Sequence, residues 1–390
     1  LCIISPPILL TSIPSNLKGV QPSLHMGEER PHTLSPSAWN RFETCPRMYW
    51  LSRQRLPRKA GMAASLGTAV HASIEDLLQI ELSGRKENET HWRQSVDREV
   101  LQTRSSVGIC DVTTLGKIDI QGFDSAEFLN KVYVNGFGKL PVGKVRYGLM
   151  LREDGIVMDD GTTARLDLNH FVMTTTTANA VGVFRHLEFC RQCLWPDLDV
   201  HLISSTEQWA QFAVAGPNSR KLLEKIIDKD HDISNEAFPY MGCKAITVCN
   251  KIPSRLFRIS FSGELAYEIA VPTRYGNSLF ETLMEAGEEY NVTPYGTEAL
   301  GVMRVEKGHA AGNELTGQTT AQNLGLEKMM SKQKDYIGNI LSRRVELNRE
   351  NKIILMGFKP VDKSIELLAG SHFISKGKII NSPCSKCFLD

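Results

Sequence analysis

Residues 144–177 constrain the fold of this chain most, because they read as three consecutive strands joined by two short turns. Their sequence is KVRYGLMLREDGIVMDDGTTARLDLNHFVMTTTT. Asp154-Gly155 and Leu168-Asn169 fall between the apolar runs, where tight hairpins place their turns. Such a meander belongs to an antiparallel sheet. It therefore favours an α+β architecture over a doubly wound parallel sheet.

Two aspartates, Asp159 and Asp160, stand side by side inside the second of these strands. Counting by two from Val157 puts Asp159 on the same face as Thr163 and Asp160 on the opposite face. Aspartate is disfavoured in strands, and a buried carboxylate needs a partner. The spacing alone leaves two interpretations open. One is a bulge or sheet-edge turn with both carboxylates in water, and the other is a strand that carries a functional carboxylate.

Helical segments lie outside the strand runs. Asp124, with Glu127 three residues later, marks one helix start, and Asn218 or Ser219 caps the segment GPNSRKLLEKII. Two amphipathic helices are expected in GNSLFETLMEAGEEY and GTEALGVMRVEKG, the second ending at Gly308. This separation of antiparallel strands from helices again indicates an α+β fold.

The composition is that of a soluble globular protein and excludes several classes of function. The chain has 390 residues, 42% of them hydrophobic and 23% charged, and its net charge of +1 implies no polyanionic partner. The apolar start, LCIISPPILL, is too short to cross a bilayer. Neither a GxGxxG nor a P-loop motif is present, so dinucleotide and nucleoside triphosphate sites have no support.

The cysteines favour a cytoplasmic protein with reduced thiols. Nine cysteines in 390 residues are too few for a disulfide scaffold. Two CxxC pairs, Cys190/Cys193 and Cys384/Cys387, lie far apart with no matching histidine pair, so we expect incidental thiols rather than a zinc site. No metal site is expected.

The chain divides into four parts by pattern. Residues 1–25 precede the first methionine, Met26, and are expected to be disordered or non-native sequence. Residues 26–90 are basic and end in the polar stretch LSGRKENETHW, which reads as a linker. Residues 91–345 form a long mixed block of strands and helices, and residues 346–390 are again strand-like.

Residues 35–78 resemble the start of RecB-like nucleases of the PD-(D/E)xK group. The residues that carry this resemblance are Ser35, Ser37, Phe42, Cys45, Pro46, Tyr49, Gly67, His71 and Glu75. Glu75 follows His71 by four positions, a spacing open to either a metal pair or a surface contact. The later Asp and Glu-x-Lys that bind Mg²⁺ in that group do not follow, so no nucleic acid partner is expected.

From about residue 92 to residue 380 the chain resembles the folate-binding aminomethyltransferase family, which includes the glycine-cleavage T-protein. The narrower resemblance is to the C-terminal part of the alpha subunit of heterotetrameric sarcosine oxidases. The motifs that carry it are SVGICDVTTLGKIDIQG, RYGLMLREDGIVMDDGTTARL, EQWAQFAVAGP, FRISFSGELAYEIAVP, TPYGTEALGVMRVEKGHAAGNELTGQTTAQNLGL and QKDYIG.

The resemblance implies one-carbon chemistry on tetrahydrofolate. In such oxidases, flavin on another subunit oxidises the N-methyl group of sarcosine, and the folate site captures the carbon as 5,10-methylene-tetrahydrofolate, leaving glycine. FAD and NAD are expected only on other regions or subunits. Positive charge develops at the transferring carbon and nitrogen, so a fixed carboxylate lowers the energy of the reaction.

The resemblance also implies site residues. Aligned without a gap from Tyr147, the family's catalytic aspartate falls on Asp159, with Asp160 as a second candidate, since Ile156 and Gly161 replace a glycine and a leucine of the motif. The pterin-binding glutamate falls on Glu268, where a carboxylate can accept two N–H bonds. Tyr147 and Phe261 are implied as further folate-binding residues, Phe261 standing where the family has a tyrosine.

Some positions depart from the family pattern. Leu300 stands where T-proteins carry an arginine for the folate tail, and Arg304 and Glu306 match a later pair that is more often structural. The family's last domain is a small β-barrel, and the resemblance to it stops near Asn381, which predicts a truncated barrel. The alternatives are a glycine-cleavage aminomethyltransferase with a lipoyl-protein partner, or a non-catalytic folate-binding or fusion fragment. The leading reading expects other sarcosine oxidase subunits as partners.

Overall fold

The computed structural model describes residues 85–312, 314–349, 352–358, 361, 373–375 and 378–381. All of them belong to the second of two compact units, Gly84–Asp390. The predictions for residues 1–25, for the nuclease-like stretch with His71 and Glu75, and for Cys384/Cys387 lie outside the described residues.

One half of this unit is built on a six-stranded sheet, called sheet A. Its strand order is β11-β1-β7-β10-β9-β8, with antiparallel neighbours except for the parallel pair β1 and β11. The strands are β1 (Gly108–Asp111), β7 (Trp209–Ala215), β8 (Cys243–Val248), β9 (Ile252–Phe257), β10 (Ala266–Pro272) and β11 (Thr293–Pro294).

The other half is built on a five-stranded antiparallel sheet, called sheet B, with the order β3-β4-β5-β2-β6. Its strands are β2 (Gly116–Gln121), β3 (Lys144–Leu151), β4 (Val157–Asp167), β5 (His170–Thr175) and β6 (His201–Ser204). The predicted meander is confirmed as β3, β4 and β5, and both turns fall between the strands as expected. All of sheet B is inserted in the chain between β1 and β7 of sheet A.

Six α-helices accompany the sheets in the described residues: α4 (Arg85–Ser105), α5 (Ser125–Val132), α6 (Ala180–Phe189), α7 (Ser219–Ile226), α8 (Gly276–Gly287) and α9 (Thr297–Lys307). Shorter helical turns are η1 (Thr177–Asn179), the π-helical η2 (Cys190–Leu194), η3 (Thr206–Gln208), η4 (Thr273–Tyr275), η5 (Glu288–Tyr290), η6 (Glu327–Met329), η7 (Leu341–Arg343) and η8 (Val345–Asn348). Among the described helices, none combines the length and the apolar character needed to cross a bilayer.

The four predicted helices are confirmed as α5, α7, α8 and α9. Asp124 and Asn218 are the residues that precede α5 and α7, and α9 ends at Gly308, whose φ of 76° is left-handed. The linker prediction is wrong for most of LSGRKENETHW, because α4 already begins at Arg85. The charged residues of this stretch are compatible with a helix, and none of them favours a turn after Gly84.

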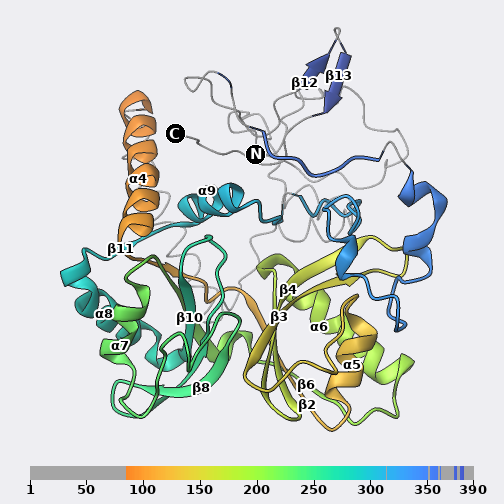
Figure 1. Ribbon diagram of the computed structural model, residues 1–390, viewed down its shortest axis with the longest axis horizontal. Helices are drawn as coiled ribbons and strands as arrows, with labels where there is room; N and C mark the ends of the chain where they lie inside the picture. Colours follow the sequence, from red (N-terminus) through yellow and green to blue (C-terminus); the bar gives the residue numbers. More distant parts are fainter. Residues whose placement is uncertain are drawn as a thin grey trace, which may run out of the picture. The chain divides into compact units, whose positions relative to one another are not determined.

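Each half has its own hydrophobic core. Figure 1 shows the two halves, with β8, β10, α7 and α8 in one and β2, β3, β4, β6, α5 and α6 in the other. Side chains from sheet A pack with Leu222, Leu223, Leu279 and Leu283 of α7 and α8. Side chains from sheet B pack in a second cluster with α5 and α6. Burial of these apolar helix faces stabilises each layer pair.

A buried charge cluster joins the two sheets. Asp119 of β2 accepts two hydrogen bonds from the guanidinium of Arg255 of β9, at 2.7 and 3.1 Å. His170 Nε2 and Ser205 Oγ lie 2.6 and 2.5 Å from the same carboxylate. Although burial opposes it, hydrogen bonding to His170 and Arg255 lowers the pKa of Asp119 to about 2. Arg255 also lies over the Trp209 ring, 4.0 Å from its centroid.

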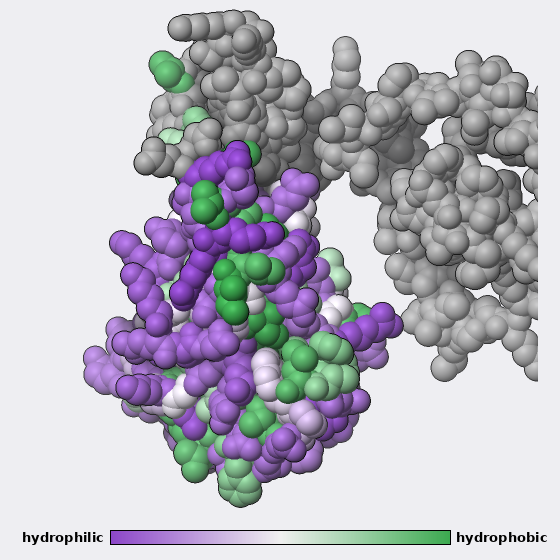
Figure 2. Space-filling model, turned by 90° about the vertical axis from the view of Figure 1, so that its right-hand side faces the viewer, coloured by the Kyte–Doolittle hydropathy of each residue, from purple (hydrophilic) through white to green (hydrophobic). Residues whose placement is uncertain are grey.

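The described part of residues 346–390 contains the hairpin of β12 (Phe373–Ser375) and β13 (Lys378–Asn381) and forms no closed barrel. Residues 352–358 run beside Asn323, whose backbone oxygen accepts from Leu355 N at 2.7 Å. Figure 2 shows one face of the described residues, where hydrophilic side chains cover most of the surface and hydrophobic ones form separate groups.

Candidate functional site

Asp159 and Asp160 lie on β4, a central strand of sheet B, on opposite faces as the period of two predicts. Asp160 pairs with Leu149 of β3, and Asp159 pairs with Met150. Gly161 follows them, and a Cβ there would lie 2.1 Å from the backbone oxygen of Thr174 on β5. The interpretation that both carboxylates stand in water is wrong, because Asp159 is 0% exposed. Its other part, the bulge, holds, since the pairing of β3 with β4 shifts register next to Asp159, between Met150 and Leu151.

Asp159 points into the interior and is held by the segment after β5. Its Oδ1 accepts from Asn179 Nδ2 at 2.9 Å, and its Oδ2 accepts from the backbone N–H of Thr176 at 3.2 Å. Burial raises the pKa of Asp159, and these two hydrogen bonds oppose that rise. The contacts of Asp159 are those of a carboxylate that anchors the β5–α6 connection.

Asp160 faces the other way and is paired with Tyr147 of β3. The Tyr147 hydroxyl donates to Asp160 Oδ2 at 2.7 Å. Burial, reinforced by the charge of Asp159, raises the pKa of Asp160 to about 6, against the hydrogen bond from Tyr147. Burial and Asp160 together raise the pKa of Tyr147, so the phenol stays protonated. Asp160 is thus a half-buried carboxyl that can hold or release a proton near neutral pH.

Two further rings lie on the Tyr147 side of this pair of residues. The His309 ring packs edge-on against Tyr147, with centroids 5.5 Å apart, and against Phe261, with centroids 4.9 Å apart. His309 follows α9, and Phe261 follows β9 of sheet A. The structure therefore brings together Asp160, Tyr147 and Phe261, three predicted site residues from both sheets, around a histidine that the sequence analysis missed.

Glu268, the remaining predicted site residue, lies on β10 of sheet A. It is buried, and its Oε2 accepts from Gln211 Nε2 of β7 at 2.5 Å. Burial raises the pKa of Glu268 to about 7, although Gln211 and the charge of Lys117 oppose this. Lys117 is itself buried, and its Nζ donates to the backbone oxygens of Thr113 and Leu115 at 2.7 and 3.1 Å.

Sequence reasoning missed His309, Gln211 and Lys117. Each lies inside a motif that carries the family resemblance, but nothing local in that motif marks it as a site residue, because each reaches the site through pairing of distant segments. Gln211 stands one strand away from Glu268 on β7, in the register that pairs Glu268 with Ala213. The sequence of β7, WAQFAVA, is apolar except at Gln211, and this apolar run is the signal that the glutamine would be buried.

Arg304 and Glu306 have structural partners, as the sequence analysis favoured. Arg304 Nη1 donates to Glu314 Oε2 at 2.7 Å and to the backbone oxygen of His309 at 3.1 Å. Glu306 forms an ion pair with Arg104 of α4, which also binds Glu264. In the described part of the chain, no three His, Cys, Asp or Glu side chains gather in a group that would hold a metal ion.

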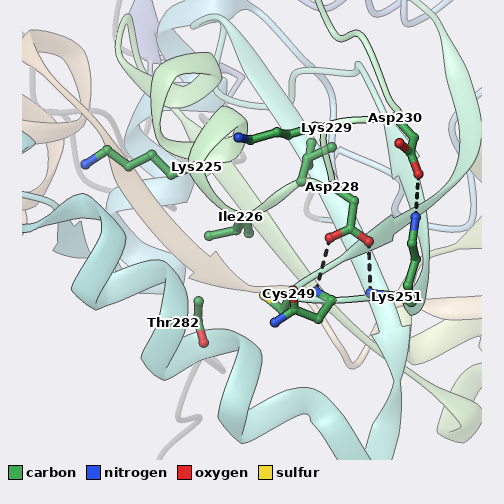
Figure 3. Close-up of a pocket in the computed structure, with 10 residues that line it drawn as sticks. Lys225, Ile226, Asp228, Lys229, Asp230, Cys249, Lys251 and Thr282 are labelled. Carbon is green, nitrogen blue, oxygen red and sulfur yellow. Dashed lines mark hydrogen bonds and ion pairs between the residues drawn. The ribbon is translucent and has the colours of Figure 1, made fainter.

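A surface pocket lies elsewhere, between the end of α7, the β8–β9 turn and Thr282 of α8 (Figure 3). Most of its charged groups are already paired. Asp228 accepts the backbone N–H groups of Asn250 and Lys251 at 3.1 and 2.9 Å, and Lys251 binds Asp230. These bonds hold a turn whose residues 249–251 have positive φ, so the pocket has the contacts of a structural turn.

The chain belongs to the GCVT family, since the family model described as the GCVT N-terminal domain matches residues 63–334. Among its relatives is sarcosine oxidase subunit alpha of Rhizobium meliloti (strain 1021), 53% identical over 294 residues, which cover 75% of this chain and 30% of that protein. The subunit alpha of Corynebacterium sp. (strain P-1) is 45% identical over 292 residues, with the same two coverages. The chain thus spans less than a third of the length of these relatives.

A solved structure agrees on the fold. The glycine cleavage system aminomethyltransferase T from Bartonella henselae superposes with a TM-score of 0.63 at 23% identity, covering 74% of this chain and 76% of that one. The predicted resemblance and the α+β aminomethyltransferase fold are confirmed. The family match begins at residue 63, well before residue 92, where the sequence analysis placed the start of the resemblance.

Proposed function

We propose that this chain binds tetrahydrofolate and transfers a one-carbon unit to it, as part of a sarcosine oxidase alpha subunit. The observation that carries the proposal is the pair of carboxyls in a chain of the GCVT family, Asp160 hydrogen-bonded to Tyr147 and Glu268 to Gln211. Burial raises the pKa of both carboxyls, to about 6 and about 7. Proton transfer at a folate nitrogen needs such a group, and so does recognition of a pterin edge.

Glu268 is the proposed pterin-binding residue. Gln211 already bonds to Oε2, so Oε1 is the oxygen that would accept an N–H group of the pterin. Bound N–H donors favour the charged carboxylate, and Lys117 favours it too. Tyr147 and Phe261 are the proposed aromatic contacts of the folate. Leu300 has no charged group that could bind the glutamate tail of the folate, so we propose no tail-binding residue at that position.

Asp160 is the proposed proton-transfer group. The carbon arrives as the imine of glycine, CH₂=N–CH₂–COO⁻, and the folate donates two N–H groups. As the first new C–N bond forms, the Asp160 carboxylate takes the proton from the attacking folate nitrogen. Asp160 passes this proton to the glycine nitrogen. The second folate nitrogen then bonds to the same carbon as the C–N bond to glycine breaks, and its proton also passes to the glycine nitrogen, which leaves as the amine. The products are 5,10-methylene-tetrahydrofolate and glycine, with no net oxidation.

Of the two aspartates, Asp160 fits this role better than Asp159. Asp159 is enclosed, and both its oxygens accept hydrogen bonds from Asn179 and Thr176. Asp160 accepts from Tyr147, whose ring packs against His309. The family resemblance favours Asp159 as the catalytic residue. Because of the contacts described above, we propose its neighbour Asp160 instead. Asp159 then acts as a neighbouring charge that raises the pKa of Asp160.

The whole reaction also needs an oxidation step that this chain does not perform in our proposal. The oxidation that produces the imine is assigned to flavin on other subunits or regions of the oxidase, which are the proposed partners. A glycine-cleavage aminomethyltransferase would use the same fold with an aminomethyl-lipoyl protein as donor. The identity of 53% to a sarcosine oxidase alpha subunit favours the first donor.

Titration of purified chain with tetrahydrofolate, followed by calorimetry, tests the proposal. We expect binding by the parent chain, loss of binding in Glu268→Ala, and binding without turnover in Asp160→Asn. Turnover is measured as methylene transfer from formaldehyde and glycine to the folate. Absence of binding by the parent chain would refute the function and leave a non-catalytic fragment. Retained turnover in Asp160→Asn, with loss in Asp159→Asn, would return the catalytic role to Asp159.

A further inference from the structure

His309 occupies a fixed position between the two halves of the protein. Its backbone N–H donates to Arg304 O at 2.9 Å, and its own backbone oxygen accepts from Arg304 Nη1 at 3.1 Å. Gly308, the residue before His309, has a left-handed backbone conformation that ends α9. The last turn of α9 therefore sets where the imidazole of His309 lies. The two hydrogen bonds with Arg304 hold the backbone of His309, and a ring on a fixed backbone can position its neighbours.

The imidazole lies between one ring from each sheet. It meets Tyr147 of β3 at an interplanar angle of 64° and Phe261, after β9, at 76°. Edge-to-face packing of this kind restrains the direction of both rings. The Tyr147 ring carries the hydroxyl that donates to Asp160 at 2.7 Å, so restraint of the ring is also restraint of this hydrogen bond.

We propose that His309 is a positioning residue: its ring holds the Tyr147 phenol on Asp160 and thereby sets how firmly that carboxyl keeps its proton. The effect of this residue on catalysis rests on the proposed function, whereas its effect on Asp160 does not. His309 acts by shape and contact, not by charge. Burial, with the charges of Lys307 and Arg304, lowers the pKa of its ring to about 4, so the ring is neutral at pH 6 to 8.

The groups around Asp160 decide whether the loss of His309 raises or lowers the pKa of this carboxyl. The Tyr147 hydrogen bond lowers the pKa of Asp160, whereas burial and the charge of Asp159 raise it. Around the histidine, Glu314 opposes the two cations but does not outweigh them. Loss of the Tyr147 hydrogen bond therefore raises the pKa of Asp160, and loss of His309 does so through Tyr147.

Carbon NMR of the chain with ¹³C-labelled aspartate tests the proposal without folate. The Asp160 signal is assigned by its absence in Asp160→Asn. We expect Tyr147→Phe and His309→Ala to raise the midpoint of its titration by about one pH unit, the size of one charge-assisted hydrogen bond. His309→Phe keeps the edge contact and should titrate as the parent does. His201→Ala, at an exposed position on β6, is the matched control.

Two results would overturn the proposal. One is a His309→Ala variant whose Asp160 titrates as in the parent, and the other is a His309→Phe variant that shifts as His309→Ala does, which would assign the effect to the ring nitrogens. If His309→Ala does not fold, His309→Leu fills the volume without the edge contact and should give the same upward shift. Failure to bind tetrahydrofolate would refute the proposed function and leave this titration intact.

Discussion

Replacement of Glu268 by glutamine should make the stability of the chain less dependent on pH. Burial raises the pKa of this carboxyl from 4.5 to about 7 in the folded state. Between these values the unfolded chain has lost the proton and the folded chain still holds it, so the free energy of unfolding falls as pH rises. At about 1.4 kcal/mol per pH unit, the full effect is about 3 kcal/mol.

Most of this change falls in an accessible range, with about 2 kcal/mol expected between pH 5 and pH 7.5. Glutamine keeps the shape of the side chain and an oxygen for Gln211, and it does not titrate. Urea unfolding of parent and Glu268→Gln chains at several pH values gives the difference. We expect the variant to gain about 2 kcal/mol relative to the parent as pH rises from 5 to 7.5.

Glu281→Gln, at an exposed position on α8, is the control for the change of residue type. Parallel pH profiles for the parent and Glu268→Gln chains would refute the reasoning. That result would mean that the carboxyl is already charged in the folded chain, held so by Gln211 and Lys117.

Three further outcomes are expected. The affinity of the parent chain for tetrahydrofolate should rise by up to about tenfold per pH unit below pH 7, because the charged form of Glu268 accepts pterin N–H bonds, and calorimetry at pH 6 and pH 8 would show no change if the carboxyl is not involved. Asp119→Asn leaves the buried Arg255 without its charge partner, so urea unfolding should show a loss of about 3 kcal/mol, and a loss under 1 kcal/mol would contradict the role of this pair in joining the sheets. Gly161→Ala should lower stability by about 1–3 kcal/mol, since the new methyl group meets Thr174 O, whereas Gly182→Ala, with open space around its Cβ position, should not.

The local parts of the fold could be predicted from the sequence. The turns at Asp154-Gly155 and Leu168-Asn169 bound strands of period two, and Asp124 and Gly308 mark helix ends, so each signal lies inside the element it defines. The start of α4 was missed, because its polar residues suit a helix and a linker equally. What packs against α4, not its own sequence, decides between the two.

The site was only partly predictable. The alternation of side chains along a strand placed Asp159 and Asp160 on opposite faces of the sheet. It could not show which of the two faces a ligand. That distinction depends on Asn179 and Thr176, which reach Asp159 only when the segment after β5 closes over β4. The pairing of Asp119 with Arg255 joins residues 136 apart in sequence, and no local pattern carries such information.

The insertion of sheet B between β1 and β7 has a consequence for how the chain folds as it is synthesised. All five strands of sheet B lie between residues 116 and 204, so this half is complete before β7 has been made. The earlier strand β1 must wait for β7, nearly 100 residues later, and then for β11. On the ribosome, the half with Asp160 can therefore form first and serve as the surface on which the half with Glu268 is assembled.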